Sequence, residues 1–529
     1  MIEYMDGPVA RRWFLSALAA LAAARASLDA LNLFPVPDAD TGSNVVRTLA
    51  AGARAAQELP DDAGLGELAA AVAEGSLWGA RGNSGVILAQ SLQSIAQTFE
   101  GFDKAGPDDM IRAFDAVASA ATAAVAEPVE GTIITVAREI AAATVNLPAG
   151  TGLRSVLATA LEAAYAATSA TTDQLPALAG TGKVDAGAVC LVLLVEALAR
   201  ELGVPTTPHD EWFPDPAEAP TEESIPGYEV MYLLRADHRE AAALRRHLSS
   251  VGEAVVVVRG AGDLWHVHVH LPHPQDALAE GSMSQVCVRR LDAPRRRIGV
   301  VAATTAPGLL EPLAEAGAVA VLGAGARTIA RAVVDTGARD VVVLPCSDES
   351  AAAAAAASRD DGVVAEDVEV RVAGTHSNLA VYDAATVLTQ RAEEYALEET
   401  VEHLHEVLAT SWHVTCGTDA GELLAAAEAL AAGFRADSPA AADTASGVGG
   451  APTAAASTTP GAASTAAAPA RTATAGGRIE LLTVLAGGRP PATAAAQRLV
   501  ALVRGRVPDV EAYVIEGGQA EAPLEAMAQ

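Results

Sequence analysis

The first two hundred residues alternate long Ala- and Leu-rich segments, spaced as in amphipathic helices, with short Gly- and Pro-rich loops. This pattern predicts an all-helical domain over residues 1–204. The loops that interrupt the helical segments are residues 34–44, 79–85, 128–132 and 181–187. Loops between well-packed helices are where binding residues are commonly found, so they are the first places to search for chemistry.

The segment 14–24 is apolar and follows Arg11 and Arg12, as in a secretory signal peptide. Glu3 and Asp6 cancel that positive charge. We therefore expect the segment to be the first helix of the domain, and the protein to be cytoplasmic without an integral membrane segment.

The pattern changes after the helical domain. Residues 205–226 are rich in Pro, Asp and Glu and predict a linker. Short β-branched runs around one helix predict a small α/β middle domain over residues 227–294. Strands alternate with helices over residues 295–435, as in a parallel α/β layer. Residues 436–477 contain little but Ala, Thr, Ser, Pro and Gly and predict a disordered linker, whereas residues 478–529 regain strand and helix signals and are expected to pack on the third domain.

The length and composition of the chain indicate several domains and argue against some classes of binding partner. A chain of 529 residues is too long for one core. The net charge of −31 argues against nucleic acid, which is bound by clustered Lys and Arg. The four cysteines form no Cys-x-x-Cys pair, which argues against a disulfide framework or a four-thiolate zinc site and fits a reducing compartment.

Two common nucleotide motifs are absent. Gly182 and Lys183 resemble the end of a P-loop, but Val184 replaces its Mg-binding Ser or Thr. Gly323-Ala-Gly325 resembles a dinucleotide fingerprint, but Thr328 stands where the third Gly belongs.

The loop of residues 31–44 places two carboxylates, Asp38 and Asp40, two residues apart on a Pro-stiffened segment. Mg²⁺ prefers oxygen ligands that it shares with nucleotide phosphates, so these carboxylates are candidate metal ligands, with Asn32 as a third. The alternative is a capped turn before a helix, because Asp and Ser favour such positions.

A second loop, Gly79-Ala-Arg-Gly-Asn-Ser-Gly85, precedes a predicted helix. Its glycines let backbone N–H groups approach a polyanion, and Asn83, Ser84 and Arg81 can donate to phosphate oxygens. Two such loops in one helical domain favour a phosphate site.

These two loops, with residues 128–132 and 184–187, resemble in order and spacing the four motifs of the nucleotide-binding L-type domain of dihydroxyacetone kinase, in the form found in the kinase component of fatty acid kinases. The resemblance implies an eight-helix barrel that binds ATP and two Mg²⁺ ions, with Asp38, Asp40 and Arg81 in catalysis. The nucleotide-binding residues that it implies are Thr41, Gly42, Ser43, Asn44, Gly82, Asn83, Ser84, Gly85, Gly131, Thr132, Asp185 and Gly187. Ala39 stands where the family usually has Gly.

The middle domain contains a His-rich strand, Trp265-His-Val-His-Val-His270, whose histidines share one face. By the same resemblance, His268 and His270 match a family His-Val-His, and Glu229 stands at the position of its partner Cys. Zn²⁺ accepts carboxylate as well as imidazole, so these three residues are candidate zinc ligands. The alternative is a set of histidines satisfied in the core or facing solvent.

The lack of histidine in the helical domain bears on which group accepts the phosphoryl group. No His precedes His209, and Thr41 stands where dihydroxyacetone kinase relatives commonly have His. A carboxylate acceptor is ionised at neutral pH and needs no base, whereas a sugar hydroxyl benefits from one, although an Asp could serve.

The sequence therefore favours a kinase subunit that phosphorylates a fatty acid carboxylate to give an acyl phosphate. The family implies a separate fatty-acid-binding partner protein, and we expect a homodimer. The alternatives are a dihydroxyacetone kinase-like enzyme and an ATP-binding regulatory or scaffold protein.

Overall fold

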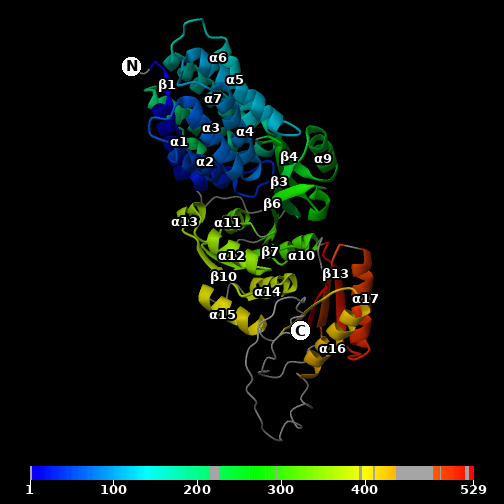
Figure 1. Cartoon of the computed structure of the whole chain (residues 1–529). Coiled ribbons are helices and arrows are strands. Elements are labelled where there is room, and N and C mark those ends of the chain that lie inside the picture. Colours follow the sequence, from blue (N-terminus) through cyan, green and yellow to red (C-terminus); the bar gives the residue numbers. More distant parts are fainter. Residues whose placement is uncertain are drawn as a thin grey trace. The chain divides into compact units, whose positions relative to one another are not determined.

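The computed structural model describes residues 3–214, 226–260, 262–279, 281–293, 296–323, 325–391, 396–408, 411–436, 481–488, 490–518 and 524–528. The chain divides into two compact units, residues 1–284 and 285–529 (Figure 1). All but the first residue of the predicted disordered linker, 436–477, lies outside the described residues.

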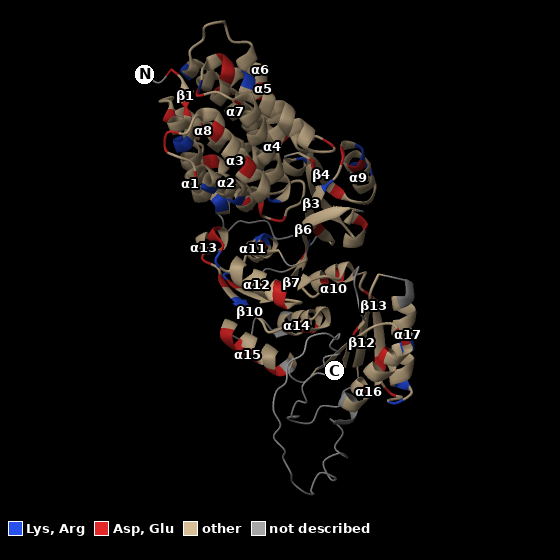
Figure 2. Ribbon diagram, viewed as in Figure 1, with Lys and Arg blue, Asp and Glu red and all other residues tan. Residues whose placement is uncertain are grey.

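Residues 3–214 form the helix-rich domain that the sequence predicts. Its eight α-helices are α1 (Gly7–Leu31), α2 (Thr41–Gln57), α3 (Leu65–Gly79), α4 (Gly82–Thr98), α5 (Pro107–Ala124), α6 (Ile133–Val145), α7 (Leu153–Gln174) and α8 (Ala186–Glu201). Two short strands, β1 (Met5–Asp6) and β2 (Lys104–Ala105), and two 3-10 turns, η1 (Pro176–Leu178) and η2 (Asp210–Trp212), complete it. Each helix packs against the next, and α8 packs against α1, so the contacts close into a ring. Most residues of these helices are neither acidic nor basic (Figure 2).

Helix α1 belongs to this core. Asp6 caps its start by accepting from the backbone N–H of Val9 (3.0 Å), and Trp13 donates from Nε1 to the carbonyl of Leu194 (2.9 Å). Among the described residues, α1 alone has the length and apolar composition of a membrane-spanning helix. A core helix passes the same test. Its contacts with α2 and α8 agree with the expectation of a first helix packed in the domain.

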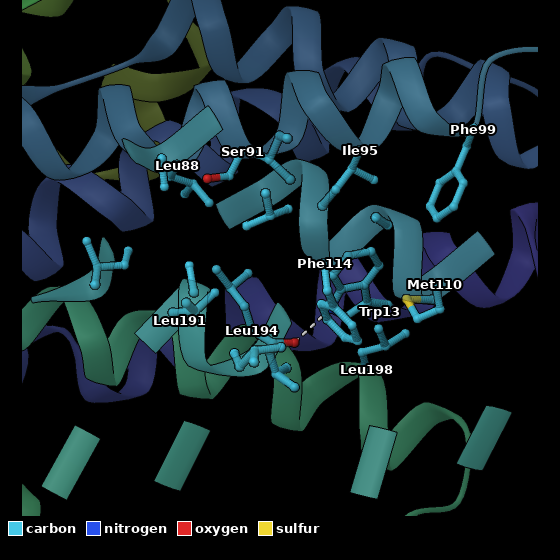
Figure 3. Close-up of a pocket in the computed structure, with 18 of the residues that line it drawn as sticks. Trp13, Leu88, Ser91, Ile95, Phe99, Met110, Phe114, Leu191, Leu194 and Leu198 are labelled. Atoms are coloured by element: carbon cyan, nitrogen blue, oxygen red, sulfur yellow. Dashed lines mark hydrogen bonds between the residues drawn. The ribbon is translucent and has the colours of Figure 1, made fainter. Parts of the chain in front are cut away.

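The interior of the helical domain encloses an apolar cavity of about 60 Å³ between α1, α4, α5, α6 and α8 (Figure 3). Of the described side chains that line it, Ser91 alone is polar, and its hydroxyl donates to the carbonyl of Ile87 (2.9 Å). A polar ligand would lose its hydrogen bonds with water here without gaining new ones. The interior is therefore unsuited to a nucleotide.

The middle region packs three neighbouring antiparallel strands against the helical domain. Its elements are β3 (Tyr228–Arg235), α9 (His238–Val251), β4 (Glu253–Arg259), β5 (Leu264–Leu271) and the 3-10 turn η4 (Pro274–Ala277). Strand β5 lies between β3 and β4. Val256 and Val258 of β4 are buried in one apolar cluster with Leu77, Val86 and Ile87. This packing brings one face of the middle sheet against the helical domain.

The second unit contains strands of two sheets. The strands of the first follow the order β10-β9-β7-β8-β6 and are parallel except for β6, which begins just before this unit. Its strands are β6 (Ser282–Arg290), β7 (Ile298–Thr304), β8 (Val319–Leu322), β9 (Asp340–Leu344) and β10 (Glu369–Val372). The accompanying helices are η5 (Pro307–Leu309), α10 (Leu310–Glu315), α11 (Ala326–Asp335), α12 (Asp348–Ala357), α13 (Asp361–Ala365), α14 (Asn378–Arg391) and α15 (Leu397–Leu408). The predicted sheet-containing later regions are confirmed.

The second sheet of this unit has the order β11-β14-β12-β13. Its elements are β11 (Trp412–Cys416), α16 (Ala420–Ala436), β12 (Leu481–Ala486), α17 (Pro490–Arg504), β13 (Glu511–Glu516) and β14 (Leu524–Ala528). Strand β14 pairs with β11 and β12, so the C-terminal segment shares a sheet with a strand that precedes the 437–480 stretch in the sequence.

Candidate functional site

The aspartate loop between α1 and α2 is held from within by Asn32, which is buried at the end of α1. The Asn32 amide nitrogen donates to the carbonyl of Val36 (2.9 Å) and to Oδ1 of Asp38 (2.6 Å). Its amide oxygen accepts from the Thr41 hydroxyl. Asn32 therefore orients Asp38 and joins it to the first residue of α2.

Asp40 is oriented by the second loop as well as by its own. Asn44 donates from Nδ2 to Oδ1 of Asp40 (2.8 Å). Gly82 has φ of 52°, and a Cβ there would lie 2.3 Å from Nδ2 of Asn44. A larger residue would displace the amide that holds Asp40, so glycine at this position connects the two loops. Ala39, between the two aspartates, also has a left-handed φ of 51°.

The first residues of helices α2, α4, α6 and α8 lie near one another, around one cavity. The four helix starts differ in how they are capped. In residues 3–214, all of which are described, Asp40 and Arg81 precede α2 and α4 without a side-chain cap, and neither helix has an acidic residue in its first turn. Thr132 and Asp185 cap α6 and α8 with side-chain hydrogen bonds. Helix starts attract anions through their N–H groups and the positive end of the helix dipole. At α2 the Ser43 N–H is already bound by the Asp29 carboxylate (2.9 Å), so α4 is the start better suited to phosphate.

A small cavity of about 20 Å³ lies where these starts meet the middle domain. Its lining residues are Asn32, Pro35, Val36, Asp38, Asp40, Thr41, Asn44, Gly82, Asn83, Ser84, Glu229, His268 and His270. The predicted Mg²⁺ ligands and the predicted zinc ligands thus share one cavity. A space of this size has room for small ions or waters but not for a nucleotide.

The three middle-domain residues of this cavity form a compact, buried group. His268 Nε2 lies 3.1 Å from His270 Nε2, and Glu229 Oε1 lies 3.6 Å from His268 Nδ1 and 4.0 Å from His270 Nε2. One ligand atom from each lies within 4.8 Å of the others. Two imidazoles and a carboxylate at this spacing can bind a transition metal ion.

A larger cavity of about 300 Å³ adjoins the small one and shares Pro35, Thr41, Asn83 and Ser84 with it. It extends past Thr132, Asp185 and Gly187 of the helical domain. The middle domain contributes Ser249 and residues 252–256. The volume lies within the range of small-molecule sites, so this is the cavity able to hold a nucleoside.

Asp185 is buried in the wall of the larger cavity. Its Oδ2 accepts from the backbone N–H groups of Ala188 (2.7 Å) and Ile133 (3.0 Å), which lie in the first turns of α8 and α6. Burial raises the pKa of Asp185 to about 6, against the opposing effect of these hydrogen bonds. Its carboxylate therefore ties two helix starts together.

Several predicted residues do not line either cavity. The Ser43 hydroxyl donates to Oδ2 of Asp29 (2.7 Å), and its backbone N–H donates to Oδ1 of the same residue (2.9 Å). Arg25 donates from Nε to the Ser43 hydroxyl (2.9 Å). The predicted residues absent from both described linings are Gly42, Ser43, Arg81, Gly85 and Gly131.

Sequence reasoning missed Asp29, which anchors the start of α2. Burial is the largest cause that raises the pKa of Asp29, and the negative charge of Asp40 raises it further. A single Asp in the last turn of a predicted helix gave no signal of this role. The proximity of His268 and His270 to Asp38 and Asp40 was also missed, because these pairs lie in different domains.

Known proteins match the N-terminal half of the chain. Residues 35–200 match the DAK2 domain, and residues 225–291 match the FakA-like middle domain of fatty acid kinase. Protein YloV of Bacillus subtilis is 32% identical over 295 residues, which cover 52% of this chain and 53% of YloV. An uncharacterized protein of Staphylococcus epidermidis, SERP0792, is 30% identical over 270 residues, covering 48% of this chain and 49% of its own.

These alignments span about half the length of the relatives. Among solved structures, a DegV family protein of Corynebacterium glutamicum aligns with 44% of this chain and 96% of its own, at 15% identity and a TM-score of 0.28.

Proposed function

We propose, from the premise that the chain is a FakA-like protein with an N-terminal DAK2 domain, that it is the kinase component of a fatty acid kinase. It transfers the γ-phosphoryl group of Mg-ATP to a fatty acid carboxylate presented by a separate lipid-binding protein. The observation that carries the proposal is the cavity shared by Asp38, Asp40 and the starts of α2 and α4.

The two adjoining cavities support an orientation for the nucleotide. The wall shared by Thr41, Asn83 and Ser84 would hold the phosphates, and the larger cavity would hold the nucleoside. Asp38 and Asp40 would hold magnesium, as two ions if the chain follows the family. Bound Mg²⁺ neutralises the charge on the transferred phosphoryl group. The closed ring of helix contacts supports the eight-helix barrel that the family implies.

The chain's own residues then position the reaction. Asn32 and Asn44 hold the two aspartates through amide hydrogen bonds, and the N–H groups of α2 and α4 stabilise the phosphate charge. A carboxylate acceptor arrives ionised, so no residue has to remove a proton from it.

The histidines of the small cavity favour a second candidate. His268 and His270 bring imidazoles to the site, so the lack of His before residue 209 no longer separates a carboxylate acceptor from a hydroxyl acceptor. A dihydroxyacetone kinase-like reaction, in which an imidazole assists a sugar hydroxyl, is therefore the rival.

We also propose that Glu229, His268 and His270 hold a zinc ion, because imidazole and carboxylate are among its ordinary ligands and all three side chains are buried together. Metal analysis of the purified chain tests this directly. Wild type should retain about one equivalent of zinc through dialysis. A His268→Ala, His270→Ala double variant that retains the same amount would refute the site.

The described cysteines are free, which supports a cytoplasmic location.

The deciding experiment identifies the product. The purified chain is incubated with Mg-ATP, a fatty acid, a lipid-binding protein from the same cell and hydroxylamine, which converts an acyl phosphate to a hydroxamate. Hydroxamate formed by wild type and absent in Asp38→Ala supports the fatty acid kinase. ADP release driven by dihydroxyacetone alone, at a comparable rate, would favour the rival.

A further inference from the structure

One wall of the larger cavity comes from the corner between α9 and β4, formed by Ser249 and residues 252–256. The backbone N–H of Ala126, in the α5–α6 loop, donates to the carbonyl of Val255 (3.4 Å). Gln90 of α4 donates from Nε2 to the carbonyl of Arg259 at the other end of β4 (3.1 Å). Strand β4 is thus fastened to the helical domain along the cavity.

The cavity contains three carboxylates with different roles. Asp185 is buried and bound to backbone N–H groups. Glu127 of the helical domain and Glu253 of β4 also line the cavity, and both are exposed. Glu253 is paired with His270 in the β4–β5 ladder, and directly opposed residues point to the same face of a sheet. Glu253 therefore lies on the face that carries the His cluster.

The part of the larger cavity beside Glu127, Asp185 and Glu253 is unfavourable for phosphate because it is negatively charged. Among the described residues that line it, none is Lys, Arg or His. The starts of α6 and α8 are capped by Thr132 and Asp185. Accessible carboxylates accept hydrogen bonds and repel anions, so they fit a neutral group with several hydroxyl donors. A ribose has this chemistry, and carboxylates bind its hydroxyls in dinucleotide sites.

We infer that the α9–β4 corner is the nucleoside-specificity element of this site, with Glu127 and Glu253 accepting hydrogen bonds from the ribose hydroxyls. This inference rests on the proposed Mg-ATP function. It makes the middle domain a direct contributor to nucleotide binding, and the two glutamates, from different domains, hold the two domains about one ligand.

Calorimetry on the full chain tests this with four probes: Mg-ATP, Mg-2′-deoxy-ATP, Mg-3′-deoxy-ATP and Mg-tripolyphosphate. Wild type should prefer ATP over a deoxy analogue by roughly ten-fold, since each lost hydrogen bond to a charged acceptor has about that value. Glu253→Ala and Glu127→Ala should each reduce that preference. Their tripolyphosphate affinity should match wild type, because the phosphate end is untouched.

Glu139→Ala is the matched control, since it removes an exposed carboxylate of α6 that lines neither cavity. It should behave as wild type with all probes. If wild type binds Mg-ATP but both glutamate variants keep the wild-type preference for ribose hydroxyls, this inference is wrong and the kinase proposal stands. If wild type binds none of the four probes, the kinase proposal fails, and the inference with it.

Discussion

The two halves of the site are the starts of α2 and α4 and the starts of α6 and α8, and they differ in how the chain closes them. Each start follows a loop rich in Gly or Pro, and each lines a cavity. Thr132 and Asp185 use their side chains to close the starts of α6 and α8, and Asp29 binds the Ser43 N–H of α2, whereas α4 has no side-chain cap. A side chain that binds these N–H groups makes a helix start less available to a ligand anion.

The carboxylates of the two halves differ in the same way. Asp38 and Asp40 each accept from one side-chain amide at the edge of a small cavity. Asp185 is surrounded by backbone N–H groups and buried. Carboxylate oxygens beside a small polar cavity are placed where a hard cation such as Mg²⁺ can reach them. The first pair is thus suited to binding metal, and Asp185 to holding structure.

The largest effect on Mg-ATP affinity is expected at Asp38 and Asp40, beside the starts of α2 and α4. Asp38→Ala or Asp40→Ala should weaken Mg-ATP binding by more than about 100-fold, because each removes a charged metal ligand. The melting temperature should change little, since both residues lie in a polar loop. Calorimetry and thermal melts measure the two effects, and Asp173→Ala, an exposed acid of α7, is the control. Wild-type affinity in both variants would remove the basis of the comparison.

The next largest effect belongs to Asp185 and depends on pH. Its folded-state pKa of about 6 lies above its ordinary value of 3.8, so the folded protein binds this proton more tightly than the unfolded chain. The contribution of Asp185 to the free energy of unfolding is therefore greatest below pH 4 and falls by about 3 kcal/mol in all as the pH rises through 6 to about 7.

Asp185→Asn should remove this part of the pH dependence. Denaturant unfolding of both proteins between pH 4 and pH 7 measures it, with the wild-type minus variant difference cancelling other titrating groups. A difference that stays constant across this range would show that Asp185 does not titrate there.

A smaller effect on Mg-ATP affinity is expected at Gly82, where the 79–85 loop contacts Asn44. Gly82→Ala should weaken Mg-ATP binding roughly ten-fold by displacing Asn44, and lower stability by about 1 kcal/mol through its left-handed backbone. Gly101→Ala is a matched control, because Gly101 also has a positive φ, of 75°, with nothing within 4 Å of its Cβ position. It should lose similar stability and keep its affinity. Equal affinities for the two variants would argue against the link through Asn44.

The smallest effect is expected at Ala39. Replacement by glycine relieves the left-handed φ of 51° but increases the freedom of the unfolded chain. The two effects nearly offset, so the net gain should be below about 1 kcal/mol, with Mg-ATP affinity unchanged. Chemical denaturation resolves the change, and a loss of stability in Ala39→Gly would mean that this backbone conformation is not strained.

The sequence by itself determined the local elements and the residues of the phosphate half. The alternation along Trp265–His270 predicted a strand that lies within β5, and the one helix predicted among the β-branched runs of the middle domain corresponds to α9. Asp38, Asp40, Asn83 and Ser84 could be found because short polar loops carry their own signal. Helix period, strand alternation and loop composition all act between residues close in the chain.

Only the tertiary structure decided which of these residues meet. It brought Glu229, His268 and His270 to the cavity of Asp38 and Asp40, and turned Ser43 toward Asp29. It also made strand β4 a wall of the larger cavity. These contacts join segments far apart in the chain, through the packing of the middle sheet on the helical domain. A hydrophobic pattern specifies that a face is buried, but the partner of that face is chosen by the fit of whole surfaces.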